Sequence, residues 1–208
     1  MLNIAVLVSG NGSNLQALID AQKHSKISNG KIVLVISSKT EAYALERAKK
    51  ENILTEALLR GSFQTQEEYD DALLRLLADH RIDLIVLAGF MTILSSNIIR
   101  HYENRIINVH PSLIPAFCGS GYYGRRVHQE VLKRGVKLTG ATVHFVNGIT
   151  DGGPIILQKA VDVMEEDTPE ELQKRVMQYA EWELLPKAVA LYCAGKISVV
   201  NGKTRIKE

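Results

Sequence analysis

Four times in the first half of the chain, a short apolar run is followed by a turn and then by a helical pattern. The runs cover residues 4–8, 32–36, 54–59 and 83–89. Continuous apolar strands of this length are typical of parallel sheets that helices cover on both faces. The alternation therefore predicts an α/β fold built on a doubly wound, mostly parallel sheet.

The other expected elements follow from apolar periodicity, from caps and from turn residues. Helices are predicted after the turn at residues 9–14 and over 41–51, 65–80, 97–102 and 127–135. Further strands are predicted to end at His110 and to cover 139–146 and 154–163, the strand at 139–146 being half-buried with one polar face. The last two make the antiparallel, C-terminal part of the sheet.

The end of the chain predicts a long helix and a hairpin. Thr168, Pro169 and Glu171 form a strong helix start with a capping box. The helix is expected to run to about residue 185, where Pro186 kinks or restarts it. Residues 199–204, with an Asn-Gly pair at their centre, predict a terminal hairpin with a type I′ turn.

Charge and hydropathy exclude several classes of protein. Lys+Arg 25 against Asp+Glu 23 gives a net charge of +2, too balanced to favour a nucleic-acid binder. A hydrophobic content of 46% fits a globular protein with a proper core, and no apolar stretch approaches the length of a membrane span. With no visible secretory signal and two cysteines in unlike contexts, we expect a cytoplasmic protein with reduced thiols. No metal-ligand spacing is present, so no metal is expected.

The turn after the first strand, residues 9–14, reads Ser-Gly-Asn-Gly-Ser-Asn. A glycine-rich turn that leads into a helix can cradle a phosphate against free backbone N–H groups. The alternative is a tight turn in which Ser13 only caps the helix. A dinucleotide site is a poorer fit, because Leu15 replaces the third glycine of that fingerprint. Ser38 and Lys39 could hold the 2′-phosphate of NADP, so an NADP site remains an alternative, but a phosphate monoester fits the turn better.

A second polar site stands at the end of the strand that finishes at His110. Asn108 and His110 share one face of that strand, because side chains alternate. The amide can stabilise an oxyanion and the imidazole can exchange a proton near neutral pH. The alternative is a strand end whose polar residues only hydrogen-bond the next loop. Asp151, on a turn with two glycines, either caps its own backbone or pairs with His110 and raises that histidine's pKa. His144 either lines the site or is a satisfied structural histidine, and the second interpretation is favoured because one acid–base group is already present.

Two more segments can border a ligand near these turns. Residues 90–94, Phe-Met-Thr-Ile-Leu, follow a buried strand and either wall a pocket for a flat, apolar ligand or form a plain core patch. Residues 116–124 are rich in glycine and aromatic residues and resemble a lid around a substrate. Because ligands bind beyond the carboxyl ends of parallel strands, one crevice can join the glycine turn to Asn108 and His110.

Four segments together closely resemble phosphoribosylglycinamide formyltransferases, the folate-dependent enzymes of de novo purine synthesis. They are residues 9–16, 87–91, 108–113 and 151–154, and the likeness spans essentially the whole chain. The resemblance implies a Rossmann-like formyltransferase fold in one domain, 1–208. Its first half, 1–110, would be nucleotide-binding-like, and its second half, 111–208, would be the folate side with the C-terminal helix and hairpin.

The resemblance also implies roles for individual residues. Gly12, Ser13 and Asn14 would hold the phosphate of glycinamide ribonucleotide, and Glu181 would contact its amine or ribose. Asn108 would bind the formyl oxygen, His110 would donate a proton and Asp151 would tune it. The folate side would consist of Asn108 and further residues of the chain, namely Gln66, Met91, Thr92, Ile93 and Leu94.

The implied co-substrate is 10-formyltetrahydrofolate, without a metal, and the implied partners are small molecules, with no nucleic acid or membrane. The protein would be a monomer or weak homodimer. Thr92 and Gln66 stand where relatives have basic residues, so contacts to the folate's anionic tail are weaker or come from Arg125 and Arg126. A formyltetrahydrofolate hydrolase, an NADP-dependent reductase and a non-catalytic phosphosugar-binding module remain alternatives.

Overall fold

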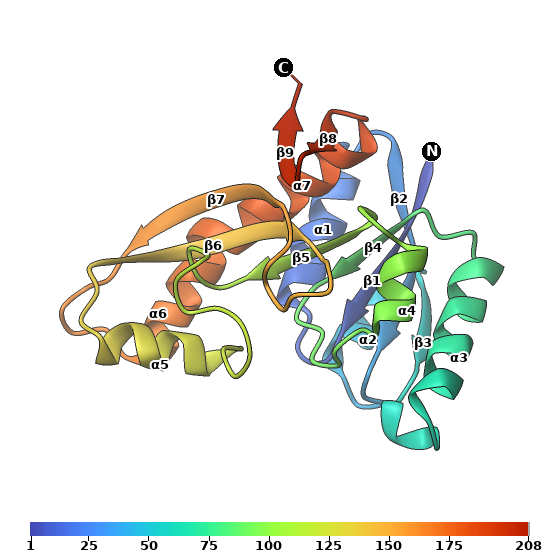
Figure 1. Cartoon of the computed structure of the whole chain (residues 1–208), viewed down its shortest axis with the longest axis horizontal. Coiled ribbons are helices and arrows are strands. Elements are labelled where there is room, and N and C mark those ends of the chain that lie inside the picture. The colour runs from blue at the N-terminus through green and yellow to red at the C-terminus, as the bar shows by residue number, and fades with distance from the viewer. Residues whose placement is uncertain (208) are drawn as a thin grey trace.

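The computed structural model describes residues 1–207, which form a seven-stranded sheet, a small hairpin and covering helices (Figure 1). The strands are β1 (Leu2–Val8), β2 (Gly30–Ser37), β3 (Leu54–Ala57), β4 (Leu84–Leu87), β5 (Ile106–His110), β6 (Leu138–Phe145), β7 (Ile155–Asp162), β8 (Ile197–Val200) and β9 (Lys203–Ile206). The helices are α1 (Ser13–Lys23), α2 (Tyr43–Lys50), α3 (Gln66–Asp79), α4 (Ser96–His101), α5 (Arg125–Lys133), α6 (Pro169–Val176) and α7 (Trp182–Cys193). A 3₁₀ turn, η1 (Arg60–Ser62), precedes α3, and a π-helical segment, η2 (Met177–Glu181), joins α6 to α7.

The large sheet has the order β3-β2-β1-β4-β5-β6-β7. Strands β1 to β5 pair in parallel, and β6 and β7 are antiparallel additions at one side. The chain leaves β1 toward β2 and β3 and then returns to β4 on its other side. This reversal creates a crevice beyond the carboxyl ends of β1 and β4, where ligands bind in such sheets. The predicted doubly wound, mostly parallel fold with antiparallel C-terminal strands is confirmed.

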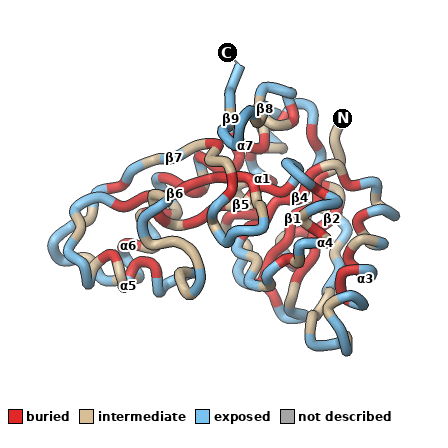
Figure 2. Tube along the Cα trace, viewed as in Figure 1, coloured by how far each residue is buried: buried red, intermediate tan, exposed pale blue. Residues whose placement is uncertain are grey.

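Helices cover both faces of the sheet, as the alternating side chains of β1 require. Ile4, Val6 and Val8 pack in one hydrophobic cluster with residues of α1, α2 and α7. Ala5 and Leu7 pack on the opposite face, in a cluster with residues of α3 and α4. Burial is therefore concentrated along the central strands (Figure 2). The sheet includes strands from both predicted halves of the chain, 1–110 and 111–208.

Strand β6 corrects one expectation, because it is not half-buried with a polar face. Every residue from Thr139 to Phe145 is buried, since β6 lies between β5 and β7 and helices cover it. Two of its polar side chains, Thr142 and His144, hydrogen-bond to backbone carbonyls. Thr142 Oγ1 donates to the carbonyl of Ser112 at 2.7 Å, and His144 Nδ1 lies 2.8 Å from the carbonyl of Phe145.

The late helix corrects a second expectation. Its start is as predicted, with Thr168 and Glu171 forming a capping box and Pro169 in the first turn. The irregularity is not at Pro186, which lies inside α7, but one turn earlier in η2. A proline removes the N–H that would bond the carbonyl four residues before it, here that of Trp182, the residue that directly follows η2.

The terminal hairpin β8–β9 confirms its prediction. Asn201 and Gly202 have φ values of 51° and 71°, the positive pair that a type I′ turn requires. No helix within residues 1–207 combines the length and apolar character needed to cross a membrane.

Candidate active site

A cavity of about 840 Å³ lies beyond the carboxyl ends of β1, β4 and β5. This volume falls within the range of roughly 300–1,000 Å³ that is typical of small-molecule sites. The cavity is lined by the glycine turn, by the segments that follow β4 and β5, by the loop before α5, by the loop after β6 and by the late helix. The lining segments are residues 10–14, 87–94, 108–111, 119–124 and 146–151, with Ile99, His144, Gln173, Met177 and Glu181.

Asn108 and His144 form one wall of the polar end. They are direct partners in the register between β5 and β6, and Asn108 Nδ2 lies 3.2 Å from His144 Nε2. Since His144 Nδ1 must donate to the carbonyl of Phe145, the neutral ring accepts from Asn108 at Nε2. This contact fixes the amide orientation and leaves the second hydrogen of Nδ2 for a ligand. His144 therefore lines the site, which is the less favoured of the two interpretations that its sequence context allowed.

His110 is buried and held from both sides of its ring. Nε2 lies 2.9 Å from the carbonyl oxygen of Phe117, to which it can only donate. The other nitrogen, Nδ1, lies 3.4 Å from Oδ2 of Asp151. Proton exchange at His110 therefore takes place at Nδ1, beside the carboxylate.

Asp151 is the meeting point of the two imidazoles. Its Oδ2 accepts from the backbone N–H of Gly119 at 2.9 Å, and its Oδ1 lies 3.7 Å from His144 Nε2. Asp151 itself has a φ of 54°, a strained backbone conformation for a residue other than glycine. The predicted approach of Asp151 to His110 is present in the structure, and the loop at 117–119 closes over both.

Burial decides how these groups titrate. It lowers the pKa of His110 below its ordinary value, and the attraction of Asp151 opposes this without outweighing it. Asp151 does act to raise the pKa of His110, as expected, but desolvation of the ring is the larger effect and sets the net direction. Burial also acts to raise the pKa of Asp151, but its contacts with His144, His110 and the N–H of Gly119 hold it below its ordinary value.

The glycine turn enters the same cavity from β1. Gly12 occupies the N-cap position of α1 with a φ of 78°, and no side chain caps the helix. The first turn of α1 carries no acidic residue, so its N–H groups and its positive dipole end can bind an anion. Ser13 is the first residue of the helix and not its cap, which removes the alternative function for that side chain.

Ser9 connects the glycine turn to the segment after β4, a link that the sequence analysis did not identify. Its hydroxyl oxygen accepts from the backbone N–H of Met91 at 2.8 Å and shares a 2.6 Å hydrogen bond with the hydroxyl of Ser38. A small hydroxyl residue directly after a buried strand was the only available signal. Ser38 is thereby engaged with Ser9, and the NADP interpretation loses one of its two residues.

Glu181 lines the cavity and contacts Asn14, the last residue of the glycine turn. Its side chain is buried and accepts a 2.6 Å hydrogen bond from Asn14 Nδ2. Burial raises the pKa of Glu181 to about 6, although the bond from Asn14 opposes this. Glu181 ends the π-helical segment, and such segments frequently occur at functional sites. The structure thus brings Glu181 and Asn14 together across 167 positions in the chain.

The segment after β4 supplies the apolar wall. Met91 and Ile93 line the cavity and remain 51% and 80% exposed, so they offer apolar surface to a ligand there. Thr92 and Leu94 also line it. All four residues predicted for the folate side in this segment therefore lie at the cavity.

Gln66 is the exception among the predicted site residues. Its side chain accepts from Arg60 at 2.8 Å and donates to Asp70 at 2.7 Å, and it does not line the cavity. The expectation that it borders the same site as Thr92 is corrected, because neighbours at the start of α3 already engage both atoms of its amide. Arg125, the suggested substitute, forms an ion pair with Glu170.

Comparison with known proteins decides the family. The sequence profile of the formyl transferase family matches residues 2–189. The chain belongs to the formyl transferase family. Within it, the chain is 41% identical over 198 residues to the phosphoribosylglycinamide formyltransferase of Escherichia coli, which covers 95% of this chain and 90% of the relative.

Solved structures show the same formyl transferase fold. A glycinamide ribonucleotide transformylase from Symbiobacterium toebii superposes with a TM-score of 0.94 at 38% identity, covering 100% of this chain and 95% of the other. A formyltetrahydrofolate deformylase from Pseudomonas syringae reaches 0.89 at 26% identity, and this chain spans 66% of it. Within residues 1–207, no group of three or more His, Cys, Asp or Glu side chains is placed to hold a metal ion.

Proposed function

We propose that this protein transfers the formyl group of 10-formyltetrahydrofolate to the amine of glycinamide ribonucleotide, with formylglycinamide ribonucleotide and tetrahydrofolate as products. One observation carries the proposal. The Asn108–His110–Asp151 cluster and an uncapped, glycine-rich helix start line the same cavity. An acyl-transfer centre beside an anion cradle fits a phosphorylated amine as the acceptor of the formyl group.

In this proposal the two ends of the cavity bind the two substrates. The phosphate lies at Gly12, Ser13 and Asn14, where helix N–H groups favour an anion. Glu181 accepts from the amine or ribose of the same substrate. The pterin lies along residues 91–94, whose exposed apolar side chains would be covered by a flat ring.

Chemistry would begin when the amine attacks the formyl carbon and the carbonyl oxygen takes up negative charge. The free N–H of Asn108 Nδ2 donates to this oxyanion, and protonated His110 stabilises it from Nδ1. Asp151 supports the imidazolium, whose formation burial opposes. The attacking nitrogen loses a proton and the folate nitrogen gains one, with water as the relay, and the C–N bond to the folate breaks.

The alternative within the family is hydrolysis of the same folate, and its supporting observation is the likeness to the deformylase from Pseudomonas syringae. The two activities differ in the acceptor. We expect deacylated folate to form only when glycinamide ribonucleotide is present. Formate release at the same rate without the ribonucleotide would favour the hydrolase.

A further inference from the structure

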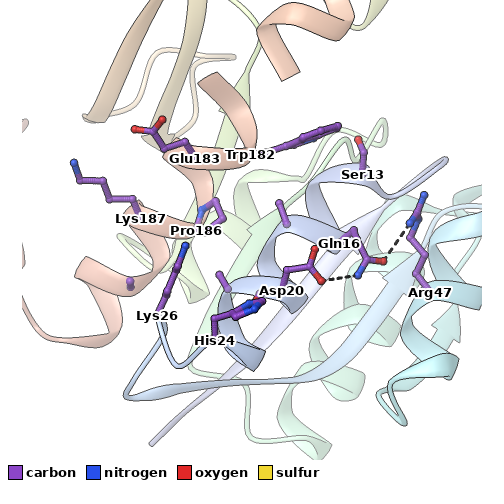
Figure 3. A pocket seen from close by; sticks show the side chains of 13 residues that line it. Ser13, Gln16, Asp20, His24, Lys26, Arg47, Trp182, Glu183, Pro186 and Lys187 are labelled. Atoms are coloured by element: carbon purple, nitrogen blue, oxygen red, sulfur yellow. Dashed lines mark hydrogen bonds between the residues drawn. The ribbon is translucent and has the colours of Figure 1, made fainter. Parts of the chain in front are cut away.

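Arg47, on α2, is not among the residues that line the cavity, but its guanidinium hydrogen-bonds to Asn11 of the glycine turn. Its Nε donates to the carbonyl oxygen of Asn11 at 2.9 Å, and its Nη2 donates to Oδ1 of the same residue at 2.8 Å. A third bond runs from Nη1 to Gln16 Oε1 at 3.1 Å, and Gln16 in turn donates to Asp20 (Figure 3). Arg47 thus fixes both the turn and the first helix that follows it.

The turn depends on such support because nothing in its own sequence caps it. Gly12 has a left-handed backbone and α1 has no side-chain cap. The start of α2 packs directly against it. A Cβ at Gly12 would come within 2.6 Å of the Cβ of Ala44, and the N–H of Ala44 donates to the carbonyl of Gly10 at 3.1 Å.

The hydrogen bond from Arg47 to the carbonyl of Asn11 also orients the backbone N–H that follows it. In a trans peptide the C=O and the following N–H point in opposite directions. Since the carbonyl of Asn11 is held toward α2 by Arg47, the N–H of Gly12 faces away from α2. Gly12 lines the cavity, so this N–H is oriented for a ligand there.

The guanidinium is itself held in place. Its Cζ lies 4.9 Å from the centre of the Tyr43 ring, a stacking geometry that favours arginine over lysine. The planar fork can bind two oxygens of Asn11 at once, which a lysine ammonium on a flexible stem cannot do with the same fixed geometry. The shape of the contact, and not its charge alone, therefore distinguishes Arg47.

We propose that Arg47 is a positioning residue for phosphate recognition, which through Asn11 holds the Gly12 N–H toward the phosphate of the substrate. This inference rests on the proposed function and adds to it a residue that touches neither substrate. This role predicts that replacing Arg47 weakens the affinity for the phosphorylated substrate and leaves the rate of formyl transfer unchanged.

The test is steady-state kinetics of Arg47→Gln and Arg47→Lys, with inorganic phosphate as a competitive inhibitor against the ribonucleotide. We expect Arg47→Gln to raise the KM for the ribonucleotide and the inhibition constant of phosphate by about tenfold, the loss of roughly one charged hydrogen bond. The kcat and the KM for the folate should stay within about twofold. Arg47→Lys keeps the charge and should remain impaired.

Lys49→Gln is the matched control, because it removes one positive charge from the same helix at an exposed side chain that pairs only with Glu46. It should leave both constants unchanged. An equal loss in kcat and in both KM values for Arg47→Gln would overturn the inference, as would full rescue by Arg47→Lys. A wild-type protein with neither turnover nor inhibition by phosphate would instead overturn the proposed function.

A double-mutant cycle tests the route through Asn11. If Arg47 acts through Asn11, the single variant Asn11→Ala already loses part of the phosphate affinity that Arg47 supports. The double variant should then lose less affinity than the sum of the two single losses. Strictly additive losses would contradict a shared route. The cycle uses the full chain and the same phosphate inhibition, so it also applies if the ribonucleotide is turned over slowly.

Discussion

Two histidines lie beside a single carboxylate, Asp151, and the amide of Asn108 contacts one of them, His144. Phe117 and Phe145 accept at their backbone carbonyls from His110 and His144. The remaining ring nitrogens then face Asp151 and Asn108. This order leaves one N–H of Asn108 without a protein acceptor among residues 1–207 and sets Nδ1 of His110 beside the Asp151 carboxylate.

Asn108→Ala removes the amide donor while leaving the strand intact. We expect kcat to fall by about 10²–10³, the usual loss for one oxyanion donor, with little change in the KM for either substrate. The kcat of His110→Ala should fall by at least the same factor. Steady-state rates at saturating substrates measure this, and wild-type turnover in either variant would count against the assignment.

Asp151→Asn removes the carboxylate that favours the imidazolium of His110. Burial already lowers the pKa of His110, so losing this attraction should lower it further. The rate should fall, and the limb of the pH profile that follows His110 should move to lower pH. NMR titration of the His110 ring in both proteins gives the direct comparison. An unchanged pKa of His110 would show that Asp151 does not influence its protonation.

Local sequence predicted part of this cluster. Alternation along one strand placed Asn108 and His110 on the same face, because that relation spans two residues. The contact of His144 with Asn108 was not predicted, since it depends on the antiparallel register that sets the two residues opposite each other. The net direction of the His110 pKa also depends on burial by the 117–119 loop, which no local pattern specifies.

The last two α-helices, α6 and α7, place a carboxylate at the cavity through the backbone irregularity between them. The π-helical segment η2 directs Glu181 into the buried contact with Asn14. The capping box at Thr168 was predictable, because its hydrogen bonds lie within one turn. The π segment was not, since its sequence carries no comparable signal, and Pro186 indicated the wrong turn.

Glu181→Gln should stabilise the protein and weaken substrate binding. Because burial raises the pKa of Glu181 to about 6 from 4.5, the folded state holds this proton more tightly than the unfolded chain. Stability therefore falls as pH rises through that window and stays lower at neutral pH. The amide should add about 2 kcal/mol to the free energy of unfolding at pH 7.

Urea unfolding at pH 7 and at pH 4 measures this gain, which should largely disappear at the lower pH. The same variant should raise the KM for the ribonucleotide by about tenfold, because an ionised acceptor has been lost. A variant with wild-type stability at pH 7 and wild-type KM would remove Glu181 from the substrate site.

Helix α5 contains a buried histidine that should make the fold sensitive to acid. His128 is fully buried, neither ring nitrogen has a hydrogen-bond partner among residues 1–207, and burial lowers its pKa to about 4. Between pH 6.5 and 4 the unfolded chain binds a proton that the folded state does not, so stability falls as pH falls.

His128→Leu should therefore lose part of the acid dependence of the wild type. The free energy of unfolding should change between pH 7 and pH 5 by about 2 kcal/mol less than in the wild type. Denaturant unfolding at the two pH values provides the comparison. An identical pH dependence in both proteins would show that His128 is not protonated on unfolding.

The sheet as a whole brings the distant segments together. The order reverses between β1 and β4, and this topology sets the glycine turn, the apolar wall and the Asn108 strand end around one cavity. Apolar runs alternating with helical patterns were sufficient to predict this arrangement, because parallel strands place their carboxyl ends on one edge. Contacts of loops and of α3 were less predictable, as the position of Gln66 shows.

The most direct measurement follows the formyl carbon itself. The protein is mixed with glycinamide ribonucleotide and 10-formyltetrahydrofolate labelled with ¹³C at the formyl group, and the products are observed by NMR. We predict that the label appears as an amide on the ribonucleotide and that Asn108→Ala slows its appearance. Label that accumulates as free formate, or that stays on the folate, would contradict formyl transfer at this site.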